Sequence, residues 1–385
     1  MNITIRPGTL RGIVDAIPSK SQAHRVLICA AFTDQPTTII CPETNRDIEA
    51  TVDCLKALGA TVTRIADSYV VEPIREYPER AILPCCESGS TLRFMLPIVG
   101  ALGIDGLFRM EGRLPQRPLS PLWEEMERMG CSLSRPTEDT VRCTGKLKPG
   151  AYSIDGGVSS QFITGLLFAH RLISGDCPLK ITGRLESAPY VEMTRQAIAL
   201  FAQGSPGEIR VEGDWSNAAF WLAARGLGSE IHLTNLNDHS AQGDRACVRW
   251  FADLATHQTI DATHIPDLVP ILSVFAGANQ GAKIIGAHRL RIKESDRLKT
   301  TAEMINNLGG CAQVTEDGLE IRGTGFTGGT VDAANDHRIA MAAAIAATVC
   351  KEPVTILGAE AVNKSYPQFW AEYARLGGNY EQYLR

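Results

Sequence analysis

Several features that mark common classes of protein are missing from this chain. It has no block of clustered Lys or Arg, and its formal net charge is -5 at pH 7. Because binding to a phosphate backbone requires a net basic face, we expect no nucleic-acid partner. No apolar run reaches the roughly 18 residues of a membrane span, so we expect no membrane association. Any anion that the protein binds is therefore expected to be small and locally held.

The cysteines also lack a recognisable pattern. There are 11 of them, none belongs to a CxxC pair, and Cys85 and Cys86 are direct neighbours. This favours neither a disulfide framework nor a zinc site. The first residues, MNITIRPGTLRG, contain no apolar segment typical of a signal peptide and are not rich in Ser and Arg like a transit peptide. We expect a soluble, cytoplasmic protein without a bound metal.

A short pattern recurs along a chain that is long enough for two cores, with 385 residues of which 44% are apolar. A helical periodicity ends in Gly and is followed by an alternating stretch. The four copies are LKALGATVTR from Leu55, MERMGCSLSR from Met126, INNLGGCAQV from Ile305 and YARLGGNYEQ from Tyr373. Each copy predicts a helix closed by a left-handed glycine and followed at once by a strand.

The spacing of these copies predicts a supersecondary unit repeated about six times. Two expected copies, near Phe201 and Leu254, are degenerate and short. Helix-Gly-strand junctions occur in any α/β protein, so an unrelated α/β fold stays an alternative at this point. We expect two similar α/β domains joined by two strands, one made of residues 1–17 and 214–385 and the other of residues 18–213.

Basic residues gather at expected helix starts. In PSKSQAHR, Ser19 or Ser21 can cap a helix whose first turn holds or adjoins Lys20, His24 and Arg25. Cations oppose the helix dipole there by roughly 0.3–1 kcal/mol unless an anion is bound between them. An ordinary solvated helix start is the alternative.

The same arrangement returns in NDHRIAMA, where Asn335 or Asp336 can cap a helix that begins with His337 and Arg338. In EGDWSNAAF, Asp214 or Ser216 can cap another helix, without basic neighbours.

Small and polar residues in three other segments could hold an oxyanion. ESGSTLRF has the composition of a backbone nest around Gly89, and GRLPQRPLSP holds Arg117 between prolines. GGVSSQFITGL offers Ser159, Ser160 and Gln161 ahead of an apolar helix. Each could be ordinary capping, but together they indicate a cleft for small substrates with phosphate and carboxylate groups.

RIKESDRL, from Arg291 to Leu298, is expected to be helical, with Lys293 and Arg297 one turn apart on one face. Like charges at this spacing repel by roughly a few tenths of a kcal/mol. We expect Glu294 and Asp296 to point elsewhere and an anionic ligand to hold the two cations together. A salt bridge between Glu294 and Arg297 is the alternative.

Asp267 in THIPDLVPILSVFA follows a proline at the start of an apolar helix. It is either an N-cap or a buried base.

Nine segments resemble those of the 5-enolpyruvylshikimate-3-phosphate (EPSP) synthase family, in the same order and over nearly the whole chain. They are PSKSQAHR, SGSTLRF, SSQFITGLL, EGDWSNAAF, SAQGD, HIPDLVPIL, RIKESDRL, NDHRIAMA and NKSYPQF. The resemblance implies two α/β domains, each of three βαβαββ-type units in an inside-out barrel, that close over the substrates. It implies transfer of the carboxyvinyl group of phosphoenolpyruvate to the 5-hydroxyl of shikimate-3-phosphate through a tetrahedral ketal, without cofactor or metal, by a monomer.

The resemblance also implies residue roles. Asp267 would take the 5-hydroxyl proton, Glu294 would transfer a proton at the enol methylene, and Lys20 would reach both substrates. Expected first contacts and shikimate-3-phosphate contacts are Ser21, Arg25, Ser159, Ser160, Gln161, Ser187, Tyr190 and Lys293. Expected phosphoenolpyruvate contacts are Gly89, Arg117, Arg297, Arg338 and Lys364.

The chain departs from the family in several places. It is shorter in residues 191–213 and 245–266, where we expect peripheral strands to be missing. Glu87 and Arg289 occupy positions where some members carry Asn. Gly89 would leave room for the inhibitor glyphosate, where Ala would crowd the phosphoenolpyruvate pocket.

Three alternative functions fit the sequence less well. The sibling enzyme that acts on UDP-N-acetylglucosamine typically has a Lys-Asn pair and a loop Cys, but here Ser21 follows Lys20 and residues 110–120 contain no Cys. A non-catalytic anion-binding relative would have lost Asp267, Glu294 or Lys20, and all three are present. The acidic charge balance disfavours a nucleic-acid end-processing enzyme.

Overall fold

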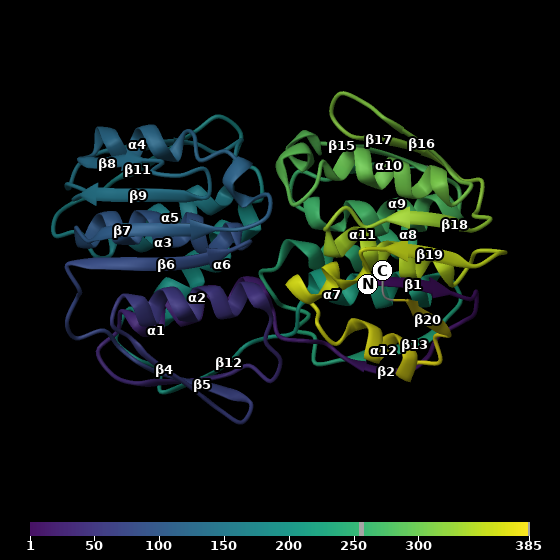
Figure 1. The fold of residues 1–385 in the computed structure, drawn as a ribbon, viewed down its shortest axis with the longest axis horizontal. Coiled ribbons are helices and arrows are strands. Elements are labelled where there is room, and N and C mark those ends of the chain that lie inside the picture. The colour runs from purple at the N-terminus through teal and green to yellow at the C-terminus, as the bar shows by residue number, and fades with distance from the viewer. Residues whose placement is uncertain (254–257, 384–385) are drawn as a thin grey trace. The chain divides into compact units, whose positions relative to one another are not determined.

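The computed structural model describes residues 1–253 and 258–383 (Figure 1). The chain divides into two compact units. We call Met1–Ile17 with Gly213–Arg385 the terminal unit, and Pro18–Glu212 the inserted unit.

The described residues of the inserted unit form three sheets. The first has the order β6 (Arg80–Cys86), β7 (Asp105–Met110), β9 (Thr140–Gly145), β8 (Cys131–Ser134). The second has the order β12 (Glu208–Arg210), β3 (Thr37–Ile40), β5 (Ser68–Glu72), β4 (Thr61–Ile65). The third pairs β10 (Tyr152–Asp155) with β11 (Leu179–Thr182).

The terminal unit repeats this arrangement. One sheet has the order β14 (Gln258–Asp261), β15 (Ala282–Ile285), β17 (Leu319–Arg322), β16 (Cys311–Val314). Another has the order β18 (Gly329–Asp332), β19 (Val354–Leu357), β1 (Asn2–Ile5), β20 (Tyr380–Tyr383). The third pairs β13 (Glu230–Thr234) with β2 (Arg11–Asp15).

All four four-stranded sheets share one pairing pattern, in which the first two strands are parallel and the remaining pairs are antiparallel. The two-stranded sheets keep the parallel pair. Within the described ranges they have no antiparallel strands added to that pair. The repeated unit is therefore confirmed, and the two-stranded sheets agree with the expected loss of peripheral strands, which stays a prediction. The expected copy at Leu254 lies outside the described residues.

Helices pack together inside each unit. Those of the inserted unit are α1 (Lys20–Ala31), α2 (Arg46–Ala57), α3 (Gly89–Leu102), α4 (Leu122–Arg128), α5 (Ser160–His170) and α6 (Ala188–Leu200). Those of the terminal unit are α7 (Trp215–Gly226), α8 (Cys247–Asp253), α9 (Val269–Ala278), α10 (Arg297–Asn307), α11 (His337–Ala347) and α12 (Phe369–Arg375). The 3₁₀ turns are η1 (Leu114–Gln116), η2 (Gly243–Ala246), η3 (Pro266–Leu268), η4 (His288–Ile292) and η5 (Ala359–Lys364).

One helix of the terminal unit, α11, is buried on all sides. Every residue of α11 is buried, and this helix packs against α7 and α9. In the inserted unit, α3 packs against α5, and α6 packs against both α1 and α5. A helix that is apolar all round belongs to a core, and the two polar residues of α11, His337 and Arg338, both lie in its first turn.

The expected glycine junctions are confirmed. Gly59, Gly130, Gly309 and Gly377 have φ of +106°, +113°, +82° and +93°. Each follows the last residue of a helix by two positions and precedes β4, β8, β16 or β20. A residue with a Cβ atom would be strained in this left-handed conformation, which explains the glycine at each junction.

Candidate active site

Asp267 lies at the centre of a group of charged residues in the terminal unit. Its Oδ1 accepts a hydrogen bond from Arg297 Nη1 over 2.8 Å, and its Oδ2 accepts one from Arg338 Nη2 over 3.1 Å. Lys293 Nζ lies 3.8 Å from Oδ1. Burial favours the neutral acid, but the charges of Arg338, Lys293 and Arg297 outweigh it and hold the pKa of Asp267 below its usual range. The residue is therefore a carboxylate at neutral pH, and 23% of its side chain remains exposed to meet a substrate.

Asp267 is not a helix cap. It lies inside η3, where no side-chain capping bond is made, and α9 begins two residues later. The N-cap alternative is therefore wrong. Asp267 is instead a charged acid whose side chain is partly exposed.

Arg297 is the most heavily paired cation of this group. Its side chain is 1% exposed and donates from Nε to Asp336 Oδ2 over 2.9 Å and from Nη2 to Glu294 Oε2 over 2.5 Å. Burial disfavours its charge, but Asp336, Glu294 and Asp267 outweigh this and raise the pKa of Arg297. Three carboxylates hold the guanidinium in one orientation.

The expected helix through RIKESDRL is wrong. Lys293 follows η4 in an extended conformation, and α10 begins only at Arg297, capped by Asp296. Glu294 does not point elsewhere but pairs with Arg297. The two cations are thus held by acidic side chains of the protein, and no ligand is needed to explain their proximity.

Two more expected phosphoenolpyruvate contacts lie at buried positions of the same unit. Arg338, 3% exposed, is in the first turn of α11 and contacts the carbonyl oxygen of Ser216 as well as Asp267. Lys364 ends η5 and donates from Nζ to the carbonyl oxygen of Asn335 over 2.8 Å. Asp336, which pairs with Arg297, is the N-cap of α11 and follows Asn335 directly. Arg338 and Lys364 are therefore both held near the charged group by the start of this helix.

In the inserted unit, three expected contacts lie in the first two turns of α1. Ser19, rather than Ser21, caps this helix. Lys20 Nζ lies 2.9 Å from Asp47 Oδ2. The buried Arg25 donates to the carbonyl oxygens of Ser21 and Tyr190 over 2.5 and 2.8 Å, and burial lowers its pKa to about 10.

Gly89 is the first residue of α3 and lies close to two guanidinium groups. A Cβ atom at Gly89 would lie 2.6 Å from Arg93 Nη1 and 2.7 Å from Arg117 Nη1. Arg93 Nη1 donates to Gln161 Oε1 over 2.9 Å, and Gln161 Nε2 donates to Ser90 Oγ over 2.8 Å. Cationic groups thus stand at the amino terminus of a helix, where the backbone also favours an anion.

The three expected phosphate-binding serines lie at helix starts. Ser159 caps α5 by accepting from Gln161 N over 3.2 Å, and Ser160 is the first residue of the helix. Ser187 precedes α6 in the left-handed conformation, with φ +54°.

Sequence reasoning missed several residues that orient the expected ones. Asp336 was considered only as a cap, and Asp47 and Arg93 were assigned no role. Asp336 is fully buried and pairs with Arg297, Asp47 pairs with Lys20, and Arg93 joins Gln161 to Gly89. The NDHR motif could have indicated Asp336, because a buried cap next to a basic residue can also pair with a distant cation.

A sequence model of the EPSP synthase family, described as 3-phosphoshikimate 1-carboxyvinyltransferase, matches residues 5–203 and 202–373. The chain belongs to the EPSP synthase family. It is 38% identical to the 3-phosphoshikimate 1-carboxyvinyltransferases of Clostridium acetobutylicum and Clostridium kluyveri, covering 99% of this chain and 98% of each relative. A solved EPSP synthase structure from Acinetobacter baumannii has the same fold, with a TM-score of 0.80, 21% identity and coverage of 99% of each chain.

Two positions where some EPSP synthases carry Asn are occupied differently here. The carboxyl group of Glu87 lies beside Gly112, which has φ +56°. Arg289 is buried, donates to the carbonyl oxygen of Thr263 over 3.0 Å, and helps to lower the pKa of Lys293. Arg289 therefore adds positive charge near Lys293 and disfavours the protonated form of this lysine, which is expected to contact shikimate-3-phosphate.

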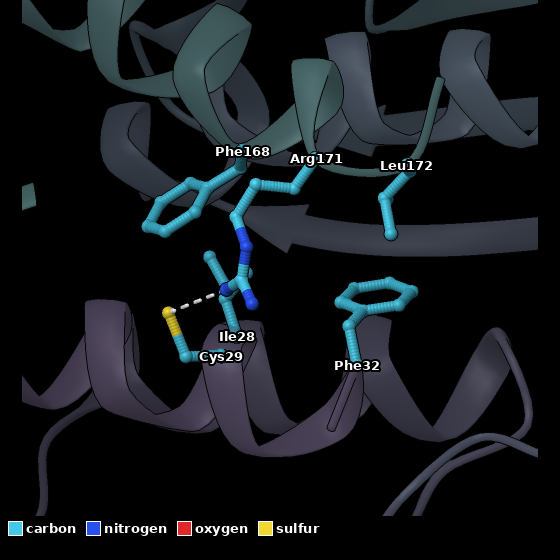
Figure 2. Close-up of a pocket in the computed structure, with 6 residues that line it drawn as sticks. All are labelled: Ile28, Cys29, Phe32, Phe168, Arg171 and Leu172. Carbon is cyan, nitrogen blue, oxygen red and sulfur yellow. Dashed lines mark hydrogen bonds between the residues drawn. The ribbon is translucent and has the colours of Figure 1, made fainter. Parts of the chain in front are cut away.

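Figure 2 shows a small pocket in the inserted unit. It is lined by Ile28, Cys29, Phe32, Phe168, Arg171 and Leu172. These residues belong to the carboxyl ends of α1 and α5 or follow them, whereas Lys20 and Ser160 begin the same two helices. The pocket is therefore separate from the helix starts that carry the expected substrate contacts.

No group of His, Cys, Asp and Glu in residues 1–253 and 258–383 has an arrangement that could hold a metal ion. None of the helices in the described part of the chain combines the length and apolar character that a membrane crossing needs.

Proposed function

We propose that this chain transfers the carboxyvinyl group of phosphoenolpyruvate to the 5-hydroxyl of shikimate-3-phosphate and releases phosphate. Membership of the EPSP synthase family supports this function. The observation that carries it in the structure is Asp267, a carboxylate held between the two arginines expected to bind phosphoenolpyruvate. A proton acceptor and cations for the substrate anion are thus provided together.

The reaction needs a proton to leave the 5-hydroxyl, a proton to reach C3 of phosphoenolpyruvate, and a proton to leave C3 again. The 5-hydroxyl oxygen adds to C2 of phosphoenolpyruvate as Asp267 takes its proton, and C3 receives a proton through Glu294. The resulting tetrahedral ketal then expels phosphate when a proton leaves C3. Glu294 and Asp267 both contact Arg297, so one guanidinium orients the acid and the base.

Asp267 in the free protein is a weak base because three cations stabilise its charge. When the carboxylate and phosphate of phosphoenolpyruvate contact Arg297 and Arg338, they neutralise part of that positive charge. The pKa of Asp267 then rises towards a value suited to accepting a proton. Binding of phosphoenolpyruvate in this way prepares the base for the second substrate.

The inserted unit is proposed to supply the remaining contacts. Ser159, Ser160 and Ser187 bind the shikimate phosphate, with Gln161 bridging and Tyr190 beside the ring. Ser21 and Arg25 contact substrate near Lys20, which reaches both ligands. Gly89 and Arg117 bind phosphoenolpyruvate. In the terminal unit, Arg297, Arg338 and Lys364 also bind phosphoenolpyruvate, and Lys293 contacts the shikimate side.

We further propose that the two units are the functional domains and that the protein is a cytoplasmic monomer. Size-exclusion chromatography with light scattering tests the oligomeric state, and a mass near twice 41.7 kDa would contradict it.

The acceptor can be tested directly. The purified protein is incubated with phosphoenolpyruvate and either shikimate-3-phosphate or UDP-N-acetylglucosamine, and the products are identified by mass spectrometry. We expect a carboxyvinyl product from shikimate-3-phosphate alone. A product from the UDP-sugar would identify the sibling reaction, and no product from either would favour a non-catalytic relative.

A further inference from the structure

A line of buried hydrogen-bonded side chains joins the first three helices of the inserted unit. His24 Nδ1 lies 2.7 Å from Thr51 Oγ1, Thr51 Oγ1 lies 2.7 Å from Thr91 Oγ1, and Thr91 Oγ1 lies 2.7 Å from Ser88 Oγ. All four residues are at most 1% exposed. They come from α1, α2, α3 and the cap of α3, and the proposed reaction gives none of them a role.

The donors along this line run in one direction. Thr91 donates towards Ser88 Oγ and, over 3.3 Å, towards the carbonyl oxygen of Asp47, which can only accept. The single hydroxyl proton of Thr91 is thereby used, so Thr51 donates to Thr91. Nδ1 of His24 must then donate to Thr51. This assigns the neutral tautomer that carries its proton on Nδ1.

The environment of His24 agrees with this assignment. Burial, followed by the charges of Lys20 and Arg25, lowers the pKa of His24 well below its usual value. Among the described residues, its Nε2 atom has no hydrogen-bond partner. The ring is therefore neutral, and the hydrogen bond from its Nδ1 to Thr51 begins the line.

Through Thr91 and Ser88, the line reaches two expected phosphoenolpyruvate contacts, Gly89 and Lys20. Ser88 caps α3 and precedes Gly89. Asp47, whose carbonyl oxygen accepts from Thr91, holds Lys20 through its carboxylate over 2.9 Å. A shift of the hydroxyl line would thus move the start of α3 and the partner of Lys20 together.

We infer that His24, Thr51 and Thr91 are positioning residues that fix Lys20 and the amino terminus of α3 for phosphoenolpyruvate. The inference rests on the proposed function. The line crosses three packed helices through side chains alone, so it sets the distance between the helix starts that carry Lys20 and Gly89. Small errors in such distances weaken substrate binding, because the charged groups no longer meet the anion together.

Thr51→Val tests this inference, because it removes the central hydroxyl while nearly keeping the volume. We expect the KM for phosphoenolpyruvate to rise by about tenfold and the KM for shikimate-3-phosphate by less than about threefold. Thr51→Ser restores a hydroxyl and should return the KM for phosphoenolpyruvate to within about threefold of the starting protein.

Thr37→Val is the matched control. Thr37 is fully buried in the same unit, and its Oγ1 forms a 2.7 Å hydroxyl pair with Ser205 Oγ that does not reach the expected site residues. A general loss of packing would affect both valine variants alike. Equal KM values for phosphoenolpyruvate in Thr51→Val and Thr37→Val would overturn the inference.

If Thr51→Val does not fold, a second pair of variants tests the inference instead. Asn at position 24 can donate an N–H near the place of Nδ1, whereas Leu cannot. We expect His24→Asn to have a KM for phosphoenolpyruvate several times lower than that of His24→Leu, and equal values would overturn the inference. If the unmodified protein releases no phosphate with both substrates, the proposed function itself fails. If it is active and the variants do not differ, only the positioning role fails.

Discussion

Arg297 donates from Nη1 to Oδ1 of Asp267 over 2.8 Å while Asp336 holds the other edge of its guanidinium. The proposed base is therefore joined to a cation that is proposed to bind the substrate anion. Their charges compensate each other in the free protein, and a bound anion competes with Asp267 for the same cation. Substrate binding and base strength are coupled through this one contact.

Replacing the proposed base should remove turnover with little effect on folding. Asp267→Asn keeps the size and one acceptor oxygen for Arg297 but cannot take the hydroxyl proton. We expect kcat to fall by about 10²–10⁴-fold, while circular dichroism stays unchanged.

Asp53→Asn, at a side chain that is 56% exposed, is the control for this loss of charge and should leave kcat unchanged. Turnover of Asp267→Asn close to that of the control would remove Asp267 from the mechanism.

The buried pair of Arg297 and Asp336 should matter for stability. Asp336→Asn leaves the guanidinium buried without its main counter-charge, so we expect the free energy of unfolding to fall by about 3–5 kcal/mol. Urea unfolding followed by tryptophan fluorescence measures this.

The pair of Arg6 and Glu381 provides the comparison, because its side chains are 64% and 52% exposed. Glu381→Gln should hardly move the unfolding midpoint, since water screens an exposed pair. An equal effect of the two variants would contradict the importance assigned to burial.

The activity should decline in mildly alkaline solution. Burial lowers the pKa of Lys293 from 10.5 to about 8, so the side chain loses its charge as the pH rises through that value. We expect kcat/KM for shikimate-3-phosphate to fall above about pH 8, and Lys293→Arg, which stays charged, to shift this decline upward. An unchanged pH profile in Lys293→Arg would exclude Lys293 as the titrating group.

The lowered pKa of Lys293 also affects stability, but in the opposite direction to activity. Between about pH 8 and 10.5 the unfolded chain binds a proton at Lys293 that the folded chain does not. This group alone therefore makes the free energy of unfolding rise with pH in that window. Lys293→Met should remove that contribution, as measured by urea unfolding at both ends of the window.

Gly89→Ala should weaken binding of phosphoenolpyruvate. The new methyl group would lie within 2.7 Å of the guanidinium groups of Arg93 and Arg117, which must move away. We expect the KM for phosphoenolpyruvate to rise by about tenfold with a smaller change in kcat, and inhibition by glyphosate to weaken. Gly8→Ala, with no atom within 4 Å of its Cβ, is the control, and equal KM values would contradict a crowded site at Gly89.

Local sequence patterns predicted much of the fold because local chemistry decides it. The glycines after four helices need a left-handed conformation, and Gly59 and Gly309 both adopt it. Of the possible helix caps, Ser19, Asp214 and Asp336 are the ones that accept a hydrogen bond from the first turn.

The charged group could not be predicted from spacing alone. RIKESDRL has a helical arrangement of charges, but Arg297 is fixed by Asp267 and Asp336, which lie 30 and 39 residues away in the sequence. These long-range ion pairs outweigh the local preference and leave Lys293 in an extended segment. The local argument therefore gave the wrong structure for this segment, while the residue roles that the family resemblance implies there stay a prediction.

Phosphate release with both substrates present tests the central claim most directly. The purified protein is given shikimate-3-phosphate and phosphoenolpyruvate, and each is omitted in turn. The account predicts release that requires both substrates and is about 10²–10⁴-fold slower in Asp267→Asn. Release from phosphoenolpyruvate alone, or no release with both substrates, would contradict it.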